Sequence, residues 1–97
     1  MQLSNGDKLM IQQFFTGMPV KRAYLFGSYA RAEADSESDI DILVELDYSN
    51  HIGFGFVQMQ MDLEKILHKK VDLVSAAGLS SYISPSIEEE KQLIYAK

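Results

Sequence analysis

The sequence predicts an α/β (α+β) fold in which a small mixed β-sheet packs against helices. Short apolar segments typical of strands are separated by segments with helical periodicity, and this order favours an α/β domain. The chain has 97 residues, of which 46% are hydrophobic and 24% charged, so it is long enough for one core and too short for two. We therefore expect residues 1–97 to form a single domain. A core of this size gives modest stability, so an oligomer with a partner protein is plausible.

Seven elements are expected along the chain. In order they are a helix, a strand, a short helix, a strand, a helix, a strand and a last helix, at residues 4–16, 20–26, 29–34, 39–46, 56–68, 71–75 and from 86 onward. The first helix begins with a capping pattern at Ser4 and Asp7, and Gly17 and Pro19 end it.

Strict alternation in residues 20–26 places Val20 on the face of Tyr24 and opposite Leu25. Gly27-Ser28 then interrupts the strand, and the alanine-rich composition of residues 29–34 predicts the short helix. Residues 39–46 alternate again. One face carries Ile40, Ile42, Val44 and Leu46, and the other carries Asp39, Asp41, Leu43 and Glu45.

The second half begins with residues 56–68, whose apolar side chains follow helical spacing. Lysines at positions 69 and 70 suit the negative end of that helix, and residues 71–75 form a short apolar strand. Ser84-Pro85-Ser86 favours the start of a last helix, with Glu88–Glu90 in its first turns as capping and solubility residues.

The charge distribution excludes some functions. The net charge is −5, and seven of the fourteen acidic residues fall within residues 33–47. This concentration repels phosphate unless cations intervene, so we expect no direct nucleic-acid binding. The chain has no cysteine, no signal peptide and no apolar segment of membrane-spanning length, which favours a cytoplasmic protein. The acidic segment is either a solvated loop or a divalent-metal site.

Three aspartates point to a metal site. Asp39 and Asp41 lie two residues apart in a predicted strand, so both project from the same face. Asp72 lies in another apolar strand, and it joins the pair if the two strands are neighbours. Three carboxylates can hold two Mg²⁺ ions for in-line phosphoryl or nucleotidyl transfer. Taken singly, each aspartate also suits the solvated side of a half-exposed strand.

Gly27 and Ser28 follow a strand and precede a helix, where backbone N–H groups attract phosphate. A single Gly-Ser pair is weak evidence, because most such pairs are only turns. Its value comes from its position twelve residues before Asp39.

These segments together resemble a known signature. Residues 27–34 (GSYARAEA) and 38–44 (SDIDILV) are similar to the G-S-x-A-R-G and S-D-[IV]-D patterns of the polymerase-β-like nucleotidyltransferase superfamily, and residues 70–74 (KVDLV) are similar to its third-carboxylate strand. More narrowly, the chain resembles the minimal nucleotidyltransferase (MNT) antitoxins, which pair with HEPN toxins. Ala32 stands where the signature usually has glycine, so a small local change is expected there.

The resemblance implies roles for individual residues. Asp39, Asp41 and Asp72 would be catalytic and would bind Mg²⁺, two ions being expected. Gly27, Ser28 and Arg31 would bind the nucleotide, although Arg31 also suits pairing with nearby acids such as Asp35 or Glu37. The implied reaction is transfer of AMP from ATP to a hydroxyl, by family resemblance a tyrosine of a HEPN toxin, which would make the chain an antitoxin.

Two other functions remain open at this stage. A non-catalytic module would neutralise its partner by covering it, and it would tolerate asparagine at both Asp39 and Asp41. A small-molecule nucleotidyltransferase of the aminoglycoside-modifying kind is disfavoured, because only about twenty-five residues follow Asp72.

Overall fold

The computed structural model describes residues 3–31, 33–35, 37–47, 55–75 and 89–97. Its elements, in chain order, are α1 (Asn5–Phe15), β1 (Val20–Phe26), α2 (Gly27–Ala30), β2 (Ile40–Leu46), α3 (Gly55–Leu67), β3 (Val71–Ser75) and β4 (Gln92–Ala96). The strands form one sheet in the order β3-β2-β1-β4. β1 is antiparallel to both β2 and β4, whereas β2 and β3 are parallel. The predicted mixed sheet packed against helices is confirmed.

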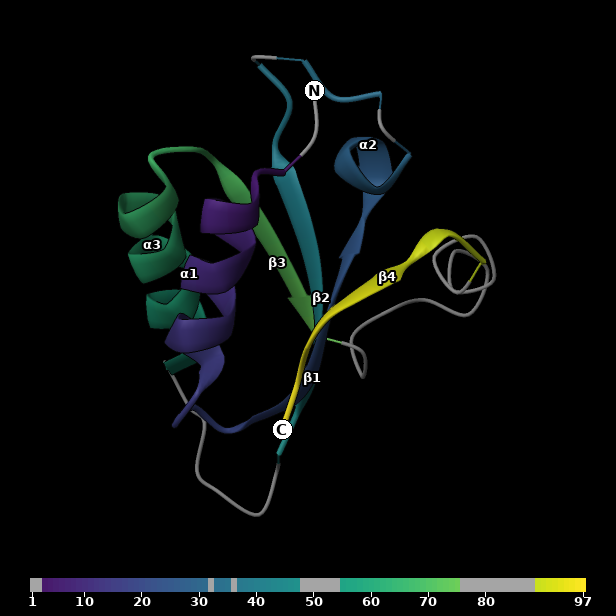
Figure 1. Ribbon diagram of the computed structural model, residues 1–97. Helices are drawn as coiled ribbons and strands as arrows, with labels where there is room; N and C mark the ends of the chain where they lie inside the picture. Colours follow the sequence, from purple (N-terminus) through teal and green to yellow (C-terminus); the bar gives the residue numbers. More distant parts are fainter. Residues whose placement is uncertain (1–2, 32, 36, 48–54, 76–88) are drawn as a thin grey trace.

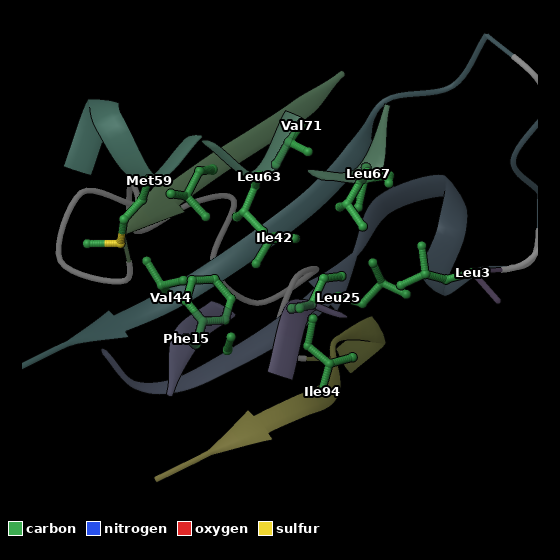
Figure 2. Packing of buried hydrophobic residues seen from close by; sticks show 14 of the residues in the cluster. Leu3, Phe15, Leu25, Ile42, Val44, Met59, Leu63, Leu67, Val71 and Ile94 are labelled. Carbon is green, nitrogen blue, oxygen red and sulfur yellow. The ribbon is translucent and has the colours of Figure 1, made fainter. Parts of the chain in front are cut away.

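The two longer helices cover one face of the sheet. α1 and α3 lie side by side on that face, and α2 stands at the end of β1 (Figure 1). α3 also supplies the crossover that a parallel pair of strands requires. Figure 2 shows the core between these layers, where Phe15, Ile42, Val44 and Leu63 are completely buried. The opposite face of β2 and β3 carries the aspartates, so the core fixes the strands that hold them.

The start and end of α1 follow from local sequence. Ser4 Oγ accepts a hydrogen bond of 3.0 Å from the Asp7 N–H, which confirms the predicted capping interaction. Gly17 has a φ of 91°, a conformation that costs glycine little, and the chain turns there into β1.

β1 departs from strict alternation. The register with β2 shifts between Val20 and Arg22, so a β-bulge places an extra residue, Lys21, in β1. Val20 is therefore buried together with Leu25 in the same core. The prediction that Val20 shares a face with Tyr24 is wrong, because sequence alternation contains no sign of a bulge.

The C-terminal element was predicted incorrectly. Gln92–Ala96 is a strand that pairs with the outer edge of β1, not a helix. Pairing with an available strand edge overrides the local helical pattern. Residues 76–88, which include the proposed start at Ser84–Ser86, lie outside the described residues. The short helix is α2, which begins at Gly27 and ends at Ala30, earlier than predicted.

No helix in the described part of the chain is long and apolar enough to cross a membrane.

Candidate active site

Asp41 and Asp72 are brought together by the parallel pairing of β2 with β3. They are direct partners in the register, flanked by the buried pairs Ile40–Val71 and Ile42–Leu73. Side chains alternate along each strand, so both carboxylates project from the face opposite the helices. The sequence left strand order open, and the structure makes these two strands neighbours.

Asp39 lies one residue before β2 and is exposed. Its charge reaches Asp41. The pKa of Asp41 is raised from 3.8 to about 6. Burial is the largest cause, followed by the negative charges of Asp72 and Asp39; Glu90 adds a smaller rise, and the positive charge of Arg31 opposes it. The three predicted carboxylates therefore influence one half-buried position, and ionising Asp41 is unfavourable without a cation.

Gly27 packs against the Asp41 carboxylate. It has a φ of 72°, and a Cβ built on it would overlap Asp41 Oδ2 and lie 3.0 Å from Asp41 Cγ. Two separate requirements therefore select glycine at this position: the left-handed backbone conformation and the close approach of the acid. The predicted loop therefore lies directly beside Asp41, one of the predicted acids.

Arg31 pairs with acids, although not the predicted ones. Its Nη1 donates to Glu90 Oε2 at 2.9 Å and Oε1 at 3.2 Å, and its Nε donates to Glu33 at 3.1 Å. Neither Asp35 nor Glu37 is among these partners. A role for Arg31 in nucleotide binding stays a prediction.

Glu90 is the residue that sequence reasoning missed. Its Oε1 also accepts from the Gly27 N–H at 3.1 Å, so the amide assigned to phosphate binding already has a carboxylate partner. Glu90 was interpreted as a helix-capping residue within an acidic run. It lies 59 positions from Arg31, and no local pattern in the sequence connects them.

Ser28 and Ser38 have different surroundings. Ser28 is half-buried, its carbonyl accepts from the Glu33 N–H at 2.8 Å, and its hydroxyl makes no hydrogen bond to any other described residue. Ser38 Oγ accepts from the Asp35 N–H at 2.9 Å, so it braces the turn before β2. The Ser38 hydroxyl is therefore used within the turn, and a role for Ser28 in nucleotide binding stays a prediction.

The donor set suits Mg²⁺. Among the described residues, no three His, Cys, Asp or Glu side chains form a preassembled metal cluster. Mg²⁺ commonly uses only one or two carboxylates and takes its other ligands from water and substrate phosphates. Asp41 and Asp72 are adjacent acids without hydrogen-bond partners in the described ranges, and a divalent cation would relieve their repulsion.

Comparison with known proteins identifies the family. Residues 10–97 match the family described as "Polymerase beta, Nucleotidyltransferase". The chain belongs to this family. A relative in the family, from Methanocaldococcus jannaschii, is 49% identical over 78 residues, which cover 78% of this chain and 76% of that protein; its name describes it as a candidate protein adenylyltransferase. The resemblance seen in the sequence and the assignment to a nucleotidyltransferase are confirmed at this level.

Solved structures of other proteins share this fold. A candidate minimal nucleotidyltransferase matches with a TM-score of 0.78 and 26% identity, covering 90% of this chain and 88% of that one. A complex of a tri-AMPylated HEPN toxin with an MNT antitoxin, from Shewanella oneidensis, contains a chain that matches with a TM-score of 0.74 and 20% identity, covering 98% and 74%. At 20% identity the second match shows the fold alone.

Proposed function

We propose that this chain is a Mg²⁺-dependent adenylyltransferase that transfers AMP from ATP to a protein hydroxyl. The observation that carries the proposal is the register pairing of Asp41 with Asp72 beside Gly27. Family membership supports the reaction class, and the name of the archaeal relative supports protein as the acceptor. The cytoplasmic location expected from the sequence is part of the proposal.

The reaction is an in-line displacement at the α-phosphorus. The acceptor oxygen forms a bond to that phosphorus, the bond to the bridging oxygen breaks, and pyrophosphate leaves. Asp39, Asp41 and Asp72 would hold Mg²⁺, which supplies neutralisation of the phosphate charge and acidification of the acceptor hydroxyl. Asp72 is exposed at the edge strand β3 and would accept the hydroxyl proton. The Ser28 hydroxyl would donate to a phosphate oxygen.

We further propose a HEPN toxin as the partner and a tyrosine of that toxin as the acceptor, which makes the chain an antitoxin. The solved complex of an AMPylated HEPN toxin with an MNT antitoxin supports this choice, because a chain of that complex has the same fold as this one. Transfer of AMP adds a bulky anion to the toxin and would silence it.

Transfer of label from α-³²P-ATP to the partner tests the chemistry. Wild type and the control Glu89→Gln, which removes one exposed charge outside the site, should label the partner equally. Asp41→Asn and Asp72→Asn should each lower the rate by about a hundredfold or more, because a metal ligand is lost. Undiminished labelling by both variants would refute the assignment of the metal ligands.

Intact-mass measurement of the partner tests the acceptor. We expect increments of one or more AMP masses with wild type and none with the double variant Asp39→Asn/Asp41→Asn. If the double variant still neutralises the toxin without any increment, the chain acts as a binding module that masks its partner, and the enzymatic proposal fails.

A further inference from the structure

The segment that enters β4 holds both ends of α2. At the start of the helix, Glu90 accepts from the Gly27 N–H at 3.1 Å, and at its end Glu90 accepts from Arg31 Nη1 at 2.9 Å. Gln92 Nε2 donates to the carbonyl of Ala30 at 2.9 Å. Two side chains from the C-terminal part of the chain therefore satisfy polar groups that a helix leaves unpaired at its ends.

α2 needs such support from outside. It has only four residues, and no side chain of its own caps its start. A single helical turn is unstable in isolation, because nucleation fixes several backbone angles for one hydrogen bond. Ionic hydrogen bonds are stronger than neutral ones, so the Glu90 carboxylate is well suited to hold this turn in place.

The position of α2 matters because Gly27 touches Asp41. The backbone of Gly27 leaves no room for a Cβ beside the Asp41 carboxylate. A shift of α2 toward β2 would therefore displace that carboxylate, and a shift away would uncover it. The negative charge of Glu90 also raises the pKa of Asp41. The spacing between α2 and the Asp41 carboxylate thus depends on the Glu90 side chain, which is distant in the sequence.

We infer that Glu90 is a positioning residue of the nucleotidyl-transfer site, which fixes α2 so that the Gly27-Ser28 backbone and Asp41 keep the spacing that a bound nucleoside triphosphate requires. The inference rests on the proposed function. In the alternative, the Glu90 carboxylate competes with phosphate for the Gly27 N–H and Arg31. Replacing Glu90 would then increase the affinity for ATP, whereas loss of positioning would decrease it.

Two substitutions distinguish the effect of the Glu90 charge from the effect of its side-chain length. Glu90→Gln keeps the size of the side chain and removes the charge that Arg31 binds. Glu90→Asp keeps the charge and shortens the side chain, so it cannot reach both the Gly27 N–H and Arg31. Glu89→Gln is the matched control, because it changes the neighbouring, exposed glutamate by the same chemistry.

Amide hydrogen exchange of Gly27 and Arg31, measured by NMR without nucleotide, tests positioning independently of catalysis. Both Glu90 variants should exchange about tenfold faster at these amides, and the control should match wild type. The Michaelis constant for ATP should rise about tenfold in both variants, with a smaller change in kcat. Melting temperatures identify any variant that has lost its fold.

Each outcome decides the inference. Unchanged exchange in both Glu90 variants overturns it, and a lowered Michaelis constant overturns it in favour of competition with phosphate. If wild type itself transfers no AMP, the proposed function fails, while the exchange experiment still decides whether Glu90 positions α2.

Discussion

Asp41→Asn should stabilise the fold although it lowers the rate of AMP transfer. The pKa of Asp41 is raised to about 6, so the folded chain holds that proton more tightly than the unfolded chain. Ionisation of Asp41 in the folded chain therefore lowers the free energy of unfolding. This loss is absent below about pH 4, grows as the pH rises, and is complete above about pH 6. A pKa rise from 3.8 to about 6 corresponds to about 3 kcal/mol, and solvent screening of this half-exposed group reduces it to about 1–2 kcal/mol. Asparagine has the shape of the protonated acid and escapes this loss.

Urea denaturation in the presence of EDTA measures this difference. At about pH 7.5 the free energy of unfolding of Asp41→Asn should exceed that of wild type by about 1–2 kcal/mol, and the gap should close toward about pH 4. The control Glu89→Gln should stay within about 0.5 kcal/mol of wild type, as expected for an exposed position. Equal stability of wild type and Asp41→Asn at neutral pH, or a gap that does not change with pH, would refute the reasoning.

Three further predictions follow from the same structure. Gly27→Ala should destabilise the fold by about 1–3 kcal/mol more than Gly17→Ala, because both glycines have positive φ but only Gly27 meets Asp41; equal losses in denaturant would contradict the overlap. Millimolar Mg²⁺ should raise the melting temperature of wild type and leave that of Asp41→Asn unchanged, and the rise should shrink below about pH 6 as protons compete; an equal rise in the variant would remove Asp41 from the metal site. Leu63→Ala should lower the free energy of unfolding by about 2–5 kcal/mol because Leu63 is completely buried, whereas Leu9→Ala at an exposed position should change it by less than about 1 kcal/mol; similar values for the two would contradict the core assignment.

Local patterns located most of the elements and the acids of the candidate site. Capping at Ser4, alternation through β2 and the Gly27-Ser28 interruption are properties of neighbouring residues, and the structure reproduces them. The Val20 bulge could not be predicted in this way, since it depends on how β1 pairs with β2. The same holds for β4, whose strand conformation depends on the edge of β1.

By itself, the sequence determined that Asp41 points away from the face of Ile40 and Ile42, because side-chain direction alternates along any strand. That Asp39 shares the face of Asp41 stays a prediction, since Asp39 lies one residue before β2. Only the tertiary structure decided that Asp72 lies opposite Asp41 and that Glu90 holds Gly27 and Arg31. Both of these contacts join segments that are distant in the chain, and strand order and register, which no local spacing encodes, bring them together.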